Sequence, residues 1–215
     1  IGKLLWDKGL VFGFNGNISM RIDAKTVLIT ATGTCLGYLT EKDILMMNLE
    51  GHVIGEGVAS SERLMHTAIY KSLPNIQCVL HTHTTYTNGF FLSNDRFTPK
   101  TFEAQFYLGE VQAIPQTTPS VTDPIPVVEA LKANNIVALK NHGVVAVGDN
   151  LFNAFVLIQE LEEQVKMDLV NVHYQRVAEG GASPAARNEV RTDGDTRRQD
   201  PLVPSKKYKL FSKEQ

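Results

Sequence analysis

Two short stretches near the start of the chain, residues 16–22 and 26–33, alternate apolar and polar side chains. Because successive side chains on a strand point to opposite faces, this alternation predicts two half-buried strands joined by a turn at 23–25. Residues 43–57 show a similar pattern around a Glu-Gly pair, which predicts a second hairpin that turns at 50–51. The first quarter of the chain is therefore predicted to be rich in antiparallel strands.

Three longer stretches repeat apolar residues at helical spacing. Residues 60–74 predict a helix that begins with Ser60 and Ser61 as hydroxyl caps. Residues 124–135 predict a second helix, and residues 150–175 predict the longest one. The apolar stripe of the longest helix includes Leu151, Phe155, Ile158, Leu161, Val165 and Leu169.

The other apolar stretches are shorter. Residues 78–83 predict a buried strand, 84–94 a short helix, 111–115 a short strand, and 136–148 a strand interrupted at 141–143. Strands joined by hairpins and interleaved with helices predict an α/β layered domain on a largely antiparallel sheet that is covered by helices. No Gly-x-Gly-x-x-Gly follows a first strand, which argues against a Rossmann fold.

Composition divides the chain into a domain at 1–175 and an extension at 176–215. The extension has few apolar residues and no periodicity, and its last residues, 208–215, have the character of a helix start. The first residues resemble a helix that is cut at its beginning and lack the pattern of a secretory signal.

Charge and cysteine content indicate which classes of binding partner and which cellular compartment to expect. The 215 residues are 43% hydrophobic and 20% charged, as in globular proteins, with a formal net charge of −2. Such a balance gives no reason to expect nucleic acid or an anionic membrane as a partner. Two cysteines, Cys35 and Cys78, favour a reducing cytoplasm over a disulfide scaffold. No apolar run approaches the roughly 20 residues of a membrane-spanning helix.

Three histidines carry the chemistry that the sequence suggests. His81 and His83 end the buried strand two residues apart, so their side chains project from the same face and can converge on one ion. His142 interrupts a second apolar stretch and is followed by a glycine. Three imidazoles with an open position are typical of a catalytic Zn²⁺ site, although another divalent transition metal fits such ligands too. The alternative is that these residues have structural roles alone, His81 and His83 as polar residues at the end of a strand and His142 as a turn residue.

Three segments have the character of anion-binding sites. In residues 15–17, Asn17 offers a side-chain amide beside a glycine, and in residues 30–34, Thr32 and Gly33 offer a hydroxyl and backbone N–H groups at a turn. Ser60 and Ser61 offer hydroxyls at a predicted helix N-terminus, where free N–H groups favour anions. Each segment alone is equally typical of ordinary turns and helix caps.

Glu62, in the first turn of the same predicted helix, has three possible roles. A carboxylate there is ordinarily a favourable partner of the helix dipole. Beside a metal it would be a fourth ligand, or a general base when a substrate displaces it.

The motifs Gly-Asn-Ile-Ser, Ile-Thr-Ala-Thr-Gly, Ser-Ser-Glu, His-Thr-His and Asn-His-Gly occur in this order between about residues 13 and 167. In this order they resemble the class II aldolase/adducin family. The resemblance implies an α/β/α layered catalytic domain on a mainly antiparallel sheet, and a homotetramer with active sites between subunits. It also implies that His81, His83 and His142 bind zinc, and that Glu62 binds the metal at rest and acts as the base. By the same resemblance, phosphate binds to Asn17, Thr32, Gly33, Ser60 and Ser61.

The implied reaction is cleavage of a ketose 1-phosphate, of the L-fuculose 1-phosphate type, into dihydroxyacetone phosphate and an aldehyde through an enediolate. Related epimerases typically carry aspartate at the position of Glu62, so the glutamate favours the aldolase. A dehydratase of the methylthioribulose 1-phosphate type, a phosphotetronate decarboxylase and a 4-epimerase remain alternatives, as does a non-catalytic adducin-like interaction module. The aldolases protonate the aldehyde oxygen with tyrosines. Here Tyr107 lies near the corresponding region, but Glu103 aligns more closely with that place.

Overall fold

The computed structural model describes residues 1–178. The predicted extension lies outside the described residues from 179 onward, including the helix start expected at 208–215. Within the described part, residues 1–175 form one compact unit.

A nine-stranded sheet forms the centre of this unit. Its strands are β1 (Asn17–Arg21), β2 (Thr26–Thr30), β3 (Ile44–Asn48), β4 (Val53–Ile54), β5 (Cys78–Thr82), β6 (Arg96–Phe97), β7 (Val111–Ile114), β8 (Ile136–Leu139) and β9 (Gly143–Gly148). They lie in the order β4-β3-β2-β1-β5-β9-β8-β7-β6, and each neighbouring pair is antiparallel except β7 with β8. The predicted hairpins β1–β2 and β3–β4 are confirmed, and β5 lies at the centre of the sheet.

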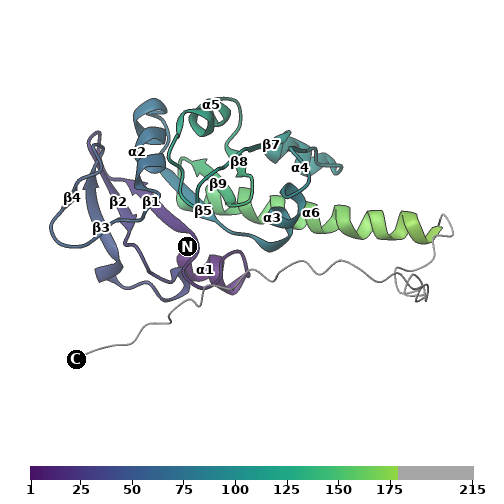
Figure 1. Ribbon diagram of the computed structural model, residues 1–215, viewed down its shortest axis with the longest axis horizontal. Coiled ribbons are helices and arrows are strands. Elements are labelled where there is room, and N and C mark those ends of the chain that lie inside the picture. The colour runs from purple at the N-terminus through teal and green to yellow at the C-terminus, as the bar shows by residue number, and fades with distance from the viewer. Residues whose placement is uncertain (179–215) are drawn as a thin grey trace, which may run out of the picture. The chain divides into compact units, whose positions relative to one another are not determined.

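Helices cover both faces of the sheet (Figure 1). The helices are α1 (Gly2–Asp7), α2 (Arg63–Ser72), α3 (Thr85–Phe91), α4 (Phe102–Leu108), α5 (Ile125–Ala133) and α6 (Leu151–Ala178), with short 3-10 helices η1 (Leu36–Tyr38) and η2 (Glu41–Asp43). Apolar residues of α2 and α5 pack on one face, together with Val79 of β5 and Val145 and Val147 of β9. Apolar residues of α1, α3, α4 and α6 pack on the other face. The predicted α/β/α layered fold is confirmed.

Three local predictions are wrong in detail. Residues 136–148 form a hairpin, β8 and β9, whose chain reverses at residues 140–142, because these two halves pair antiparallel with each other. Helix α2 begins only at Arg63, and its N-cap position is Glu62 without a side-chain cap, so Ser60 and Ser61 do not cap it. Leu169, assigned to the apolar stripe of α6, is 58% exposed.

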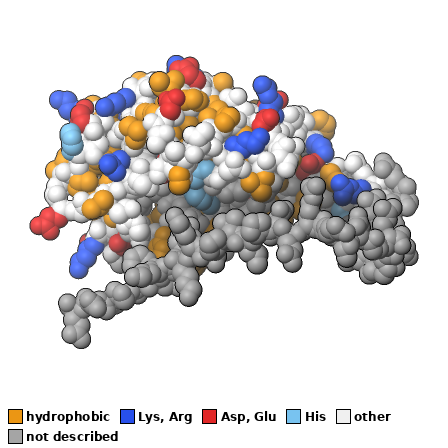
Figure 2. Space-filling model, in the orientation of Figure 1, with side chains coloured by type: hydrophobic (Ala, Val, Ile, Leu, Met, Phe, Trp, Pro, Cys, Tyr) orange, Lys and Arg blue, Asp and Glu red, His pale blue; other side chains and the backbone are white. Residues whose placement is uncertain are grey.

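Among residues 1–178, no helix is both long enough and apolar enough to cross a membrane. On the face drawn in Figure 2, Lys and Arg side chains are interspersed with Asp and Glu side chains.

Candidate metal centre and anion-binding cavity

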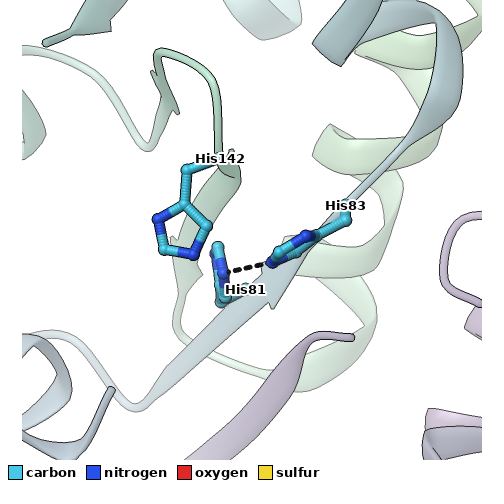
Figure 3. A group of neighbouring side chains, drawn as sticks. All are labelled: His81, His83 and His142. Atoms are coloured by element: carbon cyan, nitrogen blue, oxygen red, sulfur yellow. Dashed lines mark hydrogen bonds between the residues drawn. The ribbon is translucent and has the colours of Figure 1, made fainter. Parts of the chain in front are cut away.

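His81, His83 and His142 converge at the end of β5 (Figure 3). His81 is in β5, His83 follows it directly, and His142 lies in the reversal between β8 and β9. Because β9 pairs with β5, the reversal lies beside the end of β5. One nitrogen from each ring lies within 4.8 Å of the others, and the Nε2 atoms of His81 and His83 are 2.9 Å apart.

The backbone around His142 explains why Asn and Gly flank it. Asn141 has φ of 61°, a left-handed conformation that asparagine tolerates better than most residues. A Cβ atom on Gly143 would lie 2.4 Å from the carbonyl oxygen of Thr82 and 2.8 Å from Cε1 of His81. Only glycine therefore lets β9 approach β5 closely enough to bring the three rings together.

Hydrogen bonds and burial prepare the rings to be metal ligands. Nδ1 of His81 donates to the carbonyl oxygen of Val144 at 3.1 Å, which leaves Nε2 unprotonated and directed at the other two rings. Burial lowers the pKa of His81 well below its ordinary value, and the neighbouring His83 and His142 lower it further. Burial also lowers the pKa of His142 and brings that of His83 to about 4. Neutral imidazoles with convergent nitrogens fit Zn²⁺ or another divalent transition metal.

Glu62 lies beside the three rings. Its side chain is buried, and Oε2 accepts a hydrogen bond from the N–H of Val121 at 3.1 Å. Oε1 lies 3.6 Å from Nε2 of His142. Burial raises the pKa of the Glu62 carboxyl, and the Val121 N–H partly offsets this increase. One oxygen is thus held by the backbone, while the other lies beside His142 and is available to ligate a metal or to accept a proton.

All nine residues singled out from the sequence line one cavity of about 180 Å³. Three histidines and Glu62 line it, together with Asn17, Thr32, Gly33, Ser60 and Ser61. Six further residues line it, which are Phe14, Asn15, Gly16, Ala31, Thr34 and Pro119. Four of them belong to the predicted anion-binding segments 15–17 and 30–34, whereas Phe14 and Pro119 lie outside these segments and were missed.

The groups available to an anion differ from the sequence expectation in one respect. The N–H of Thr32 donates to the carbonyl oxygen of Val58 at 2.9 Å, so Thr32 can offer only its hydroxyl. Gly33 follows it with φ of 72° in an exposed turn. Ser60 Oγ accepts the N–H of Glu62 at 3.2 Å, so the Ser60 hydroxyl hydrogen remains available to a ligand.

The two candidates for a further proton donor lie away from this cavity. Tyr107 and Glu103 are both exposed on α4, and neither lines it.

A buried polar chain behind the cavity was missed as a unit. Asn17 and Ser19 share one face of β1, and His66 and Tyr70 share one face of α2, because their spacings match the strand and helix repeats. The four side chains are buried and joined by hydrogen bonds. Polar residues recurring at the buried positions of two facing elements are the pattern that could have revealed them.

Comparison with known proteins identifies the family. Residues 1–169 match the family model described as the Class II Aldolase and Adducin N-terminal domain. The chain belongs to the class II aldolase/adducin family. The expectations of this family, and of a lyase of the class II aldolase type, are thereby confirmed. Enzymes of this class depend on a metal, and the three histidines form a group that can hold one.

Individual relatives carry two different activities in their names. L-fuculose phosphate aldolase of Methanococcus vannielii is 31% identical over 82% of this chain and 96% of its own length. The 3-oxo-tetronate 4-phosphate decarboxylase of Haemophilus influenzae is also 31% identical, over 78% of this chain and 82% of its own. Among solved structures, L-fuculose-1-phosphate aldolase from Thermus thermophilus has a TM-score of 0.74 and 31% identity, covering 85% of this chain and 93% of its own.

Proposed function

We propose that the protein is a zinc-dependent aldolase that cleaves a ketose 1-phosphate of the L-fuculose 1-phosphate type into dihydroxyacetone phosphate and an aldehyde. One observation carries the proposal: a single cavity has three neutral imidazoles and a carboxylate beside the amide, hydroxyls and glycine turn suited to a phosphate. Relatives named as phosphosugar aldolases support it.

His81, His83 and His142 would hold the metal. A bound zinc ion supplies a Lewis acid for oxygens on which negative charge develops. The hydrogen bond from His81 to the Val144 carbonyl keeps that ring in the orientation and tautomer that a metal ligand needs.

Glu62 is the proposed base. Cleavage of the carbon–carbon bond leaves an electron pair on the donor carbon, as an enediolate, and this carbon must take up a proton to become dihydroxyacetone phosphate. Oε1 of Glu62, which lies 3.6 Å from Nε2 of His142, would carry that proton. The raised pKa of the carboxyl brings it closer to the pH range in which a general base works. The Val121 N–H holds the other oxygen and so sets the direction of the first.

Asn17, Thr32, Gly33, Ser60 and Ser61 would bind the phosphate. They contribute amide and hydroxyl donors and a turn with φ of 72° at Gly33. Binding energy from a phosphate that does not react would hold the donor carbons near Glu62.

A phosphotetronate decarboxylase is the second candidate, because a relative of equal identity carries that activity in its name. It would use the same donors for the phosphate and the same ligands for the metal. A 4-epimerase and a dehydratase of the family are further alternatives that product analysis separates. A non-catalytic interaction module is disfavoured, because this chain keeps three histidines and a carboxylate around one cavity.

The proposal extends to assembly and location. We expect a homotetramer in which a neighbouring subunit completes the aldehyde end of the site, since neither Tyr107 nor Glu103 lines the cavity. A cytoplasmic enzyme agrees with the two cysteines, Cys35 and Cys78, which are both free thiols here.

The test is proton exchange at the donor carbon. Zinc-loaded protein is incubated with dihydroxyacetone phosphate in D₂O, and the exchange is followed by NMR with a metal-free control. Zinc-dependent, stereospecific exchange is the expected result. Confirmed zinc binding without exchange would contradict the aldolase and favour the decarboxylase, for which release of CO₂ from a 3-oxo-tetronate 4-phosphate is the direct assay.

A further inference from the structure

Four buried side chains link the core to the cavity in a single line of hydrogen bonds. The Tyr70 hydroxyl lies 2.8 Å from Ser19 Oγ, and Ser19 Oγ lies 2.6 Å from Nδ1 of His66. Nε2 of His66 lies 2.5 Å from Oδ1 of Asn17. Tyr70, Ser19 and His66 are at most 1% exposed, and Asn17, the last member, reaches the cavity.

The hydrogens along this line have a defined direction. A buried phenol must donate its hydrogen, and among the described residues Ser19 Oγ is its partner. Ser19 therefore directs its own hydrogen to Nδ1 of His66, which must accept and so carries no proton. Burial lowers the pKa of His66 to about 3, so the ring is neutral and its one proton is on Nε2. Nε2 then donates to Oδ1 of Asn17.

This direction determines which end of the Asn17 amide faces a ligand. With Oδ1 engaged by His66, the Nδ2 group, which has no hydrogen bond to any described residue, is the end left for the cavity. In the reversed arrangement His66 would accept from Nδ2, and a carbonyl oxygen would face the cavity and repel an anion. The reversed arrangement also leaves one buried hydroxyl hydrogen, that of Ser19 or that of Tyr70, without an acceptor.

We propose that His66 is a positioning residue for anion binding: the line from Tyr70 through Ser19 and His66 locks the Asn17 amide with its NH₂ group toward the phosphate. This inference rests on the proposed phosphate site. To that site it adds His66, which does not line the cavity, and it gives a physical reason why Asn17 presents a donor to an anion.

The first experiment reads the tautomer of His66 directly. In zinc-loaded full-length protein labelled with ¹⁵N histidine at neutral pH, two-bond ¹H–¹⁵N correlation spectra distinguish the two ring nitrogens, and loss of one signal set in His66→Gln assigns them. The expected result is a neutral ring with its proton on Nε2. A proton on Nδ1, or a charged ring, would overturn the inference. The tautomer is read in the parent protein, so the result stands even if His66→Phe does not fold.

The second experiment measures the affinity for inorganic phosphate by titration of the same zinc-loaded protein. Any contact between phosphate and the metal is common to all variants and cancels. We expect His66→Phe to weaken binding by about fivefold, the worth of one hydrogen bond. Thr67→Val is the matched control, because it removes a hydroxyl of the same helix whose one partner among residues 1–178 is the Leu64 carbonyl, and it should bind phosphate as the parent does.

A double-mutant cycle shows whether His66 acts through Asn17. In an Asn17→Ala background, His66→Phe should cause no further loss of phosphate affinity, because the group that it orients is gone. Additive losses would overturn the inference. Unchanged affinity in His66→Phe, with Asn17→Ala weakened, would overturn the inference alone. Unchanged affinity in Asn17→Ala would overturn the proposed phosphate site together with it.

Discussion

Asn17 and His81 are opposite each other in the antiparallel pairing of β1 with β5. Side chains at such paired positions lie on the same face of the sheet, with Cβ atoms about 5 Å apart. The group proposed to bind phosphate and a proposed metal ligand are therefore neighbours by virtue of strand register. A substrate that reaches both must carry its phosphate close to its reacting oxygens, as a small ketose 1-phosphate does.

Replacement of Glu62 by Gln should abolish proton transfer and keep the fold. The amide preserves the shape of the side chain and still accepts from the Val121 N–H, but it cannot take up a proton. We expect metal content near that of the parent and donor exchange reduced by about 10²–10⁴-fold. NMR exchange rates and metal analysis of the same sample measure both quantities. Exchange within a factor of about three of the parent would remove Glu62 as the base.

Replacement of His81 by Ala should release the metal and activity together. The ring is buried, its Nδ1 is engaged by Val144, and its Nε2 faces the other two rings, so its loss removes one of three convergent ligands. Metal content after dialysis, measured by mass spectrometry, should fall well below one ion per chain. His52→Ala, on an exposed turn, is the control and should keep the metal. Full occupancy in His81→Ala would contradict the site.

Part of the candidate site could be predicted because it depends on local spacing. His81 and His83 are two residues apart on a strand, and this alone places them on one face. His142 reaches them through the pairing of β5 with β9, more than 60 residues apart, and local pattern carries no information about such a pairing. His142 entered the prediction as a histidine that interrupts a second apolar stretch, and the order of motifs, which resembles that of a known family, joined it to the other two.

The misses have tertiary causes. Ser60 and Ser61 fit the rule for helix caps, yet the chain turns inward so that Glu62 reaches Val121, 59 residues away, and the helix begins later. Helix α4 was not predicted, because its buried apolar face consists only of Ala104 and Leu108, which is too short to give a helical periodicity. The first of these errors arises where a contact distant in sequence overrides local preference.

A methyl group on Gly143 should separate the metal ligands. In Gly143→Ala the new Cβ would overlap the Thr82 carbonyl and His81 Cε1, so β9 must shift away from β5. We expect a loss of about 1–3 kcal/mol in the free energy of unfolding, from overpacking, and weaker metal binding. Calorimetric metal titration and urea unfolding measure the two effects.

Gly89→Ala is the matched control for this change. Gly89 lies in α3 with open space around its Cα, so alanine there should be neutral or stabilising. Equal metal affinity in Gly143→Ala and Gly89→Ala would show that the close approach of β9 is not required.

Metal-free protein should lose stability as the pH falls below about 6.5. The unfolded chain protonates His66 near its ordinary pKa of 6.5, whereas burial lowers the pKa in the folded state to about 3. The unfolded state therefore binds more protons between these values, and the free energy of unfolding falls by up to about 1.4 kcal/mol per pH unit as the pH decreases. Above 6.5 this contribution is constant. His83, with a pKa of about 4, acts in the same direction down to that pH.

Glu62 affects the pH dependence of the free energy of unfolding in the opposite direction. Its raised folded pKa means that the folded state holds a proton that the unfolded state has released, so this group favours folding at lower pH. Urea unfolding at pH 7, 6 and 5 should show the net loss, and His66→Gln should show a shallower slope. A parent protein equally stable at pH 7 and 5 would contradict the buried neutral histidines.

Loss of the Glu162 charge should destabilise the segment that follows His83. This buried carboxylate of α6 accepts the N–H of Tyr86 at 3.0 Å, and the N–H and hydroxyl of Thr87 at 2.8 and 2.7 Å, at the start of α3. In Glu162→Gln an NH₂ group replaces one oxygen and opposes either the Tyr86 donor or the Thr87 donors, so we expect a loss of about 2–3 kcal/mol. Glu163→Gln, whose exposed side chain pairs with the half-buried Lys166, should cost less than about 0.5 kcal/mol. Urea unfolding of the two variants compares their free energies of unfolding directly, and equal losses would show that Glu162 does not anchor α3.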